Sequence, residues 1–106
     1  MNFLISFSQT ALSAGTWQCS FDDGTVSSGN TTYRITGKIP VVSSITIETS
    51  VSTTLYIKGD VDSVVYLPAG KYLRIKATIE DMKIVSTGTF DLWFSASTEL
   101  HSPEVS

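Results

Sequence analysis

The sequence predicts an all-β domain, an antiparallel β-sandwich of about eight strands, with a jelly roll as one form of it. Three observations indicate this class. Apolar and polar residues alternate with a period of two through most of the 106 residues. Gly, Pro, Asn or Asp separate the alternating stretches at short, even intervals. No helical crossover lies between these stretches, so the strands must run mainly antiparallel.

The first two strands are expected at residues 2–8 and 16–21, where every second residue is apolar or a cysteine. Residues 1–21 contain no charged side chain, although free edge strands are usually protected by charge, proline or a bulge. We therefore expect the first strand to lie inside the sheet or against a neighbouring subunit. An Asp-Asp-Gly turn at residues 22–24 predicts a hairpin, because Gly adopts a positive φ without strain.

The middle of the chain continues the pattern. Residues 25–27 are expected to pair back briefly, and further strands are expected at 32–38, 41–49 and 55–58. Pro40 separates two of these strands, because a proline cannot donate to a central ladder.

The clearest local signal lies at residues 62–79, which predict a hairpin. Its arms are residues 63–67 and 71–79, joined by a Pro-Ala-Gly turn. Proline presets φ at the second position of such a turn, and glycine supplies the positive φ that closes it. The second arm has an apolar face of Leu73, Ile75, Ala77 and Ile79 and a polar face of Tyr72, Arg74, Lys76 and Thr78.

The C-terminal part supplies one more clear strand. Residues 80–85 are expected to form a turn and a short strand, because six residues are too few for a stable helix. The last strand is expected at 89–96. We expect a single domain over residues 1–106, in which residues 98–106 form a polar tail.

Composition argues for a covered surface and against a nucleic-acid partner. Charged residues make up 16% of the chain, whereas 30 of its 106 residues are Ser or Thr. An uncharged surface resists association poorly, so we expect another chain to cover part of it. The net charge is −3 and no basic stripe occurs, so we expect no nucleic-acid partner.

We expect neither a membrane span nor a secretory signal. No apolar run approaches the roughly 18 residues that a transmembrane helix needs. Lys and Arg do not precede the N-terminal apolar run, which polar residues also interrupt.

The sequence contains few residues of the kinds that catalyse reactions or bind metals. His101 is the only histidine and Cys19 the only cysteine, which are too few for a zinc site, and Cys19 is expected to face inward. Three acidic doublets occur at residues 22–23, 60 with 62, and 80–81. Turn chemistry explains them, with a calcium site or a pair of catalytic acids as alternatives. We expect no catalytic residue, no cofactor and no metal.

The aromatic residues divide between the two faces of the predicted strands. Tyr56, Tyr72 and Trp93 point outward, where such rings contact sugars or proteins unless a loop or second sheet covers them. Seven further aromatic residues point inward and are expected in the core: Phe3, Phe7, Trp17, Phe21, Tyr33, Phe90 and Phe94. The candidate partner-contact residues are Phe3, Ile5, Tyr56, Tyr72, Arg74 and Trp93.

The turn at residues 67–74, Leu-Pro-Ala-Gly-Lys-Tyr-Leu-Arg, resembles a hairpin phrase of small β-sandwich virion proteins of tailed bacteriophages. Proteins of that group decorate capsids or build fibres and connectors. The low-charge, Ser/Thr-rich strands also resemble the group. The resemblance covers eight residues and implies a structural role in the virion, with no catalytic residues.

Two function hypotheses follow. The first is a non-enzymatic structural subunit: a capsid-decorating (cement) or other virion protein that binds the shell and copies of itself, with a trimer as one arrangement. The second is a carbohydrate-binding or receptor-recognition module that uses Trp93, Tyr72 and Tyr56.

Overall fold

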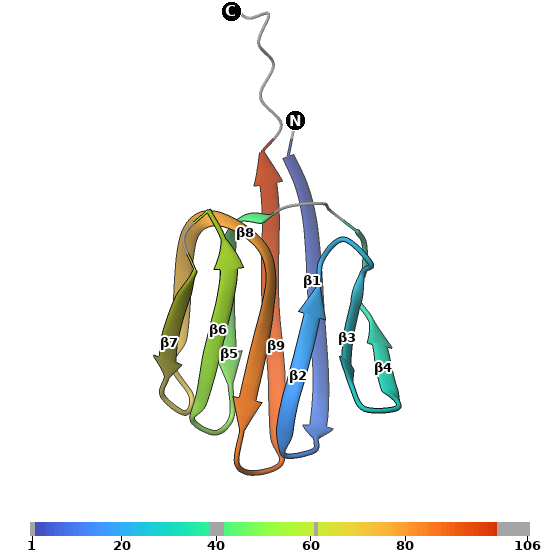
Figure 1. Ribbon diagram of the computed structural model, residues 1–106, viewed down its shortest axis with the longest axis vertical. Helices are drawn as coiled ribbons and strands as arrows, with labels where there is room; N and C mark the ends of the chain where they lie inside the picture. The colour runs from blue at the N-terminus through green and yellow to red at the C-terminus, as the bar shows by residue number, and fades with distance from the viewer. Residues whose placement is uncertain (1, 39–41, 61, 100–106) are drawn as a thin grey trace, which may run out of the picture.

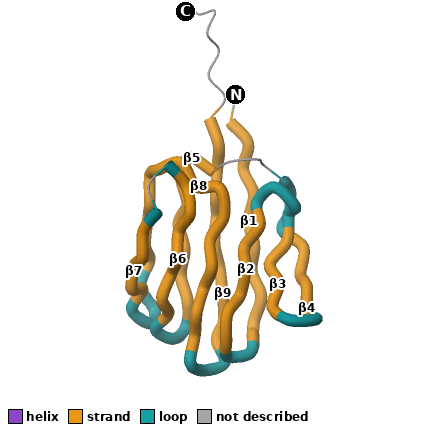
Figure 2. Tube along the Cα trace, viewed as in Figure 1, coloured by secondary structure: helices purple, strands orange, loops and turns teal. Residues whose placement is uncertain are grey.

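The computed structural model describes residues 2–38, 42–60 and 62–99, and the regular structure in these ranges is entirely β-strand (Figure 1). No helix that could cross a bilayer occurs in these ranges. The strands are β1 (Asn2–Leu12), β2 (Gly15–Ser20), β3 (Thr25–Ser28), β4 (Thr31–Arg34), β5 (Val42–Thr49), β6 (Thr53–Gly59), β7 (Ser63–Leu67), β8 (Tyr72–Ser86) and β9 (Phe90–Glu99). They run along the long axis of the molecule, and most turns lie at its two ends (Figure 2).

All described strand pairs are antiparallel, which confirms the predicted all-β, antiparallel class. The hydrogen-bonded order is β1-β9-β5-β8-β2-β3-β4, and β6 pairs with both β8 and β7. The nine strands thus form one sheet that curves into a nearly closed, barrel-like shape, rather than two clearly separate sheets. Strand β1 lies at one end of this order, and Thr36, beyond β4, hydrogen-bonds to it.

The long strand β8 passes through both layers of the curved sheet. Its first part, residues 72–79, pairs with β5. Its second part, residues 79–86, lies between β6 and β2. The prediction of a turn at residues 80–85 is therefore wrong. A register shift between Lys58 and Gly59 leaves Glu80 without a partner on β6, so the strand bends there without ending.

The predicted hairpin at residues 62–79 is also wrong, although its turn chemistry is as expected. Gly70 has the predicted positive φ, at 69°, and its amide donates to the Thr49 carbonyl. Strand β7, however, pairs with β6 and not with β8. The Pro-Ala-Gly turn carries the chain between two layers of the curved sheet, because the same dihedral angles suit an arch as well as a hairpin.

The other turns and strand ends follow the sequence more closely. The hairpin between β2 and β3 is confirmed, and Gly24 adopts φ of 73° in its turn. Strand β9 continues through Thr98 and Glu99, where a polar tail was expected. The rest of that tail, and with it His101, lies outside the described residues.

The core lies between the two layers of the curved sheet. The inward-facing aromatic residues Phe7, Trp17, Phe21, Phe90 and Phe94 are buried as predicted, and Tyr33 is half-buried. The ring of Phe94 stacks on Phe7 with centroids 5.4 Å apart and meets Phe21 edge-on at 5.9 Å. Because Phe7 belongs to β1 and Phe21 follows β2, Phe94 joins both layers.

Candidate interaction faces

Two outward faces of the sheet carry the exposed aromatic side chains. The first, which we call the Trp93 face, comprises residues 93–97 of β9, 44–48 of β5 and 72–76 of β8 at their outward positions. The second, which we call the Tyr56 face, comprises outward residues of β6, β7 and the second part of β8: Tyr56, Lys58, Val64, Tyr66, Asp81, Lys83 and Val85. The two faces lie on opposite sides of the core.

The Trp93 face is built around an aromatic pair. Strand β5 runs between β8 and β9, and Glu48 stands in register with both Tyr72 and Trp93. The two rings reach across β5 and meet edge to face, with centroids 6.0 Å apart and an interplanar angle of 88°. Tyr72 is 69% exposed, whereas Trp93 is half-buried. The two rings thus form an apolar surface in register with the carboxylate residue Glu48.

Small hydroxyl side chains extend the Trp93 face away from the pair. Thr46 lies in register between Arg74 on β8 and Ser95 on β9. In the next outward row, Ser44 lies between Lys76 and Ser97. Trp93 itself borders two hollows, of about 440 and 220 Å³. Away from the pair the surface is therefore polar, with small hydroxyl groups on β5 and β9 beside the longer Arg74 and Lys76 side chains of β8.

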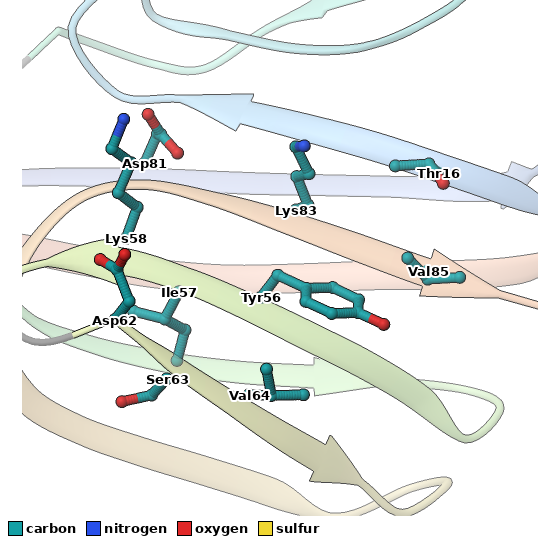
Figure 3. A pocket seen from close by; sticks show the side chains of 10 residues that line it. All are labelled: Thr16, Tyr56, Ile57, Lys58, Asp62, Ser63, Val64, Asp81, Lys83 and Val85. Atoms are coloured by element: carbon teal, nitrogen blue, oxygen red, sulfur yellow. The ribbon is translucent and has the colours of Figure 1, made fainter.

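The Tyr56 face holds the larger hollow, a groove of about 690 Å³ (Figure 3). Tyr56 is 45% exposed, and its neighbours on β7, Val64 and Tyr66, are each 65% exposed. The lining includes two lysines and two aspartates, so the groove has no net charge. Its lining residues are Thr16, Tyr56, Ile57, Lys58, Asp62, Ser63, Val64, Asp81, Lys83 and Val85.

The structure places the six candidate contact residues in four different settings. Tyr72, Arg74 and Trp93 lie together on the Trp93 face, and Tyr56 lies on the other face. Ile5 is only 3% exposed and packs in the core, so its side chain offers no surface to a partner. Phe3 lies in β1 opposite Thr98, and its side chain is outside what the structure describes.

Sequence reasoning missed Val64 and Tyr66 as surface residues. Both belong to the stretch Ser63-Val64-Val65-Tyr66-Leu67, which has apolar residues at four successive positions. Because both faces of this strand are apolar, alternation could not distinguish the inward from the outward one. The signal that could have identified them is the absence of charge in residues 63–67, because a strand whose edge stays free is usually protected by charged side chains.

The described residues contain no group of three or more His, Cys, Asp or Glu side chains placed to hold a metal ion. Cys19 is fully buried, and burial, with a smaller contribution from the Asp81 carboxylate, raises its pKa to about 12. Its thiol is therefore protonated at neutral pH and is a poor nucleophile.

Two acidic doublets have local structural roles. Asp23 Oδ2 accepts a hydrogen bond from the Ser20 hydroxyl at 3.1 Å, and Asp62 Oδ1 accepts one from the Gly59 amide at 3.4 Å. The third doublet, Glu80 and Asp81, lies inside β8, so the expectation that it occupies a turn is wrong.

Comparisons of this chain with protein-family models, with curated proteins and with solved structures find no match.

Proposed function

We propose that this protein is a non-enzymatic structural subunit, which assembles with copies of itself and with a larger protein partner. One observation carries the proposal: large apolar side chains are exposed on both sides of the molecule. Leu4 and Tyr72 are 72% and 69% exposed on one layer, and Tyr56, Val64 and Tyr66 are 45–65% exposed on the other. A subunit inside an assembly needs two such surfaces, whereas a simple binding module needs one.

The polar character of the two faces supports a protein partner. Interfaces between proteins are enriched in aromatic residues. The groove on the Tyr56 face has two lysines and two aspartates, and the Trp93 face has four Ser and Thr side chains and three charged ones around its aromatic pair. Because charges of both signs occur on each face, both faces suit a mixed polar protein surface better than a ligand with one strong charge.

We further propose that the assembly is a virion, in which the protein decorates a capsid as a cement protein or serves as another virion component, with a trimer as one arrangement. The resemblance of the turn at residues 67–74 to small phage virion proteins supports this location. In particles purified from its natural source, the chain is expected at a fixed copy number. Its absence from every particle fraction would contradict the virion assignment.

We also propose that the fold is a jelly-roll form of sandwich. Strand pairing supports this form if the two parts of β8 are counted as two strands and the β3–β4 hairpin is treated as an addition to the eight strands of a jelly roll. One layer is then β1-β9-β5-β8, with the first part of β8, and the other is β2-β8-β6-β7, with the second part. A jelly roll distributes eight strands over its two sheets in this alternating order.

Self-assembly is tested by sedimentation velocity and light scattering on the full chain over a wide concentration range. The proposal predicts a discrete oligomer that forms reversibly, without an open-ended size distribution. A monomer at every concentration that also binds no assembled shell would contradict it.

The Tyr72–Trp93 pair favours carbohydrate or receptor-glycan binding as a second candidate function. Aromatic rings beside a carboxylate and small hydroxyl groups match the apolar faces and hydroxyl groups of a sugar. A glycan array, followed by titration of tryptophan fluorescence, tests it. Binding is expected to disappear in Trp93→Ala and to persist in Tyr56→Ala, which alters the opposite face. An array without any response would remove this candidate.

A further inference from the structure

Strand β7 is an edge strand without the usual protection. It hydrogen-bonds to β6 on one side and to no other strand among the described residues, and Figure 1 shows it at one side of the molecule. Its five residues, Ser63–Leu67, include no charge, no proline and no register shift against β6. An edge of this kind presents main-chain N–H and C=O groups to another strand.

The outward side of β7 is also apolar. Val64 and Tyr66 are each 65% exposed, and Tyr56 lies in register beside Val64 on β6. Val65, between them, is half-buried and points to the inner side together with buried Leu67. A strand added at this edge would therefore meet apolar side chains on both of its faces.

Strand β7 is complementary to itself when the second copy runs antiparallel. A two-fold axis at Val65 places Val64 of each copy opposite Tyr66 of the other and keeps both outward faces on the same side of the joined sheet. Pairs of an aromatic and a β-branched residue across strands are stabilising. The symmetry makes this pair twice, and Tyr56 of each copy flanks it.

Charge selects the antiparallel direction. Exposed Asp60 and Asp62 precede β7, and exposed Lys71 follows it. In the antiparallel pair, the acidic end of one copy faces the Lys71 end of the other at both ends of the interface. A parallel pair would instead place the two Asp62 carboxylates side by side, and such like-charge neighbours are destabilising.

We propose that β7 pairs antiparallel with β7 of a second copy of this chain, centred on Val65, and so extends the sheet across a two-fold axis. The inference deepens the proposed structural role, on which it rests, by naming the surface through which copies associate. It gives a two-fold dimer in place of the trimeric arrangement. The occupant is a second copy rather than an unrelated strand, because both the side-chain pairs and the end charges are self-complementary.

A charge on the outward side of β7 tests the proposal. Tyr66→Lys is expected to weaken self-association about tenfold or more in sedimentation velocity, because a lysine protects an edge strand against pairing. Tyr72→Lys is the matched control. Tyr72 is a tyrosine of similar exposure, 69% against 65%, on the Trp93 face, which this proposal assigns to the larger partner and not to a second copy. It is expected to associate like the unmodified chain, and circular dichroism verifies that both variants are folded.

A cross-link tests the register. In the proposed pair, Val65 of one copy faces Val65 of the other at a separation that a disulfide spans. Val65→Cys is therefore expected to give a covalent dimer on mild oxidation, whereas Tyr72→Cys is expected to stay monomeric on a non-reducing gel. The buried thiol of Cys19 does not compete.

The outcomes separate this inference from the proposed function. Two results would overturn the β7 pairing but not the structural role. In the first, Tyr66→Lys leaves the oligomer intact. In the second, the oligomer cross-links through Tyr72→Cys and not through Val65→Cys. A third result would also overturn the β7 pairing: the unmodified chain is monomeric, and Tyr66→Lys abolishes its binding to shell particles. In that case β7 binds a different protein and not a second copy. A monomer that binds no shell contradicts the structural role itself.

Discussion

Ser6 and Thr36 hold each other through three hydrogen bonds across 30 residues of sequence. The Ser6 amide donates to Thr36 Oγ1 at 2.8 Å, and both the amide and the hydroxyl of Thr36 donate to the Ser6 carbonyl at 3.2 Å. Ser6 lies in β1 and Thr36 follows β4, so this contact joins the two ends of the strand order. It satisfies part of the free edge of the uncharged first strand.

Removal of the Thr36 hydroxyl is expected to destabilise the fold modestly. Thr36→Val keeps the β-branched shape but leaves the Ser6 amide without its side-chain acceptor, which predicts a loss of about 1 kcal/mol in the free energy of unfolding. Urea denaturation measures the change. Thr32→Val, at an exposed threonine of β4, is the control and is expected to change stability by less than about 0.5 kcal/mol. Equal effects of the two substitutions would show that the Ser6–Thr36 contact adds no stability.

Gly59 lies where the pairing of β6 with β8 shifts register, and its lack of a side chain is required there. A Cβ at Gly59 would overlap the Thr78 carbonyl oxygen, whereas a Cβ at Gly88 would meet no atom within 4 Å. Gly59→Ala must displace the backbone of β8 and is expected to destabilise the protein by roughly 2 kcal/mol or more. Gly88→Ala, the matched control, is expected to stay within about 1 kcal/mol of the original chain. Thermal unfolding followed by circular dichroism compares them, and a fully stable Gly59→Ala would contradict the close approach.

Trp17 combines core packing with a hydrogen bond. Its side chain is 1% exposed, and its indole Nε1–H donates to the Ser13 carbonyl at 2.8 Å. Trp17→Phe loses that bond and leaves part of the buried volume empty, so a loss of about 2 kcal/mol is expected in urea unfolding. The half-buried Trp93 gives the control, since Trp93→Phe is expected to lose less than about 1 kcal/mol. The reverse order of these losses would contradict the assignment of Trp17 to the core and Trp93 to the surface.

The buried thiol of Cys19 makes stability fall at alkaline pH. Its pKa is about 12 in the folded protein against 9.0 ordinarily, so its contribution is complete below pH 9 and is lost as pH rises from there to 12. Between pH 7 and pH 10 the loss from this group is about 1.4 kcal/mol, because the unfolded chain ionises first. Urea unfolding at both pH values measures it. Cys19→Ala is expected to lack this component, and an identical pH dependence in the two proteins would exclude it.

The alternation of the sequence identified most strands and most of the core. Four aromatic residues are buried as expected: Trp17, Phe21, Phe90 and Phe94. A one-residue error in the predicted faces would have placed them outside, so the predicted faces of their strands are right. The continuity of β8 could not be predicted. The apolar spacing from Ile79 to Met82 breaks the period of two, and a bulge produces the same break as a turn does.

The partners of the strands were also beyond sequence reasoning, and the candidate faces depend on them. Tyr72 and Trp93 meet only because β5 lies between β8 and β9, an order that no local pattern encodes. Val64 and Tyr66 are exposed because β7 pairs with β6 and leaves its other edge without a strand partner among the described residues. The residue types predicted contact surfaces, and the topology determined which residues share one.

The passage of β8 through both layers has a consequence for unfolding. One 15-residue strand hydrogen-bonds to β5 in its first part and to both β6 and β2 in its second. Neither layer can separate from the other without breaking this strand, so the two are expected to unfold as one cooperative unit. Amides in the second part of β8, which has partners on both sides, should then exchange with solvent only at the rate set by global unfolding.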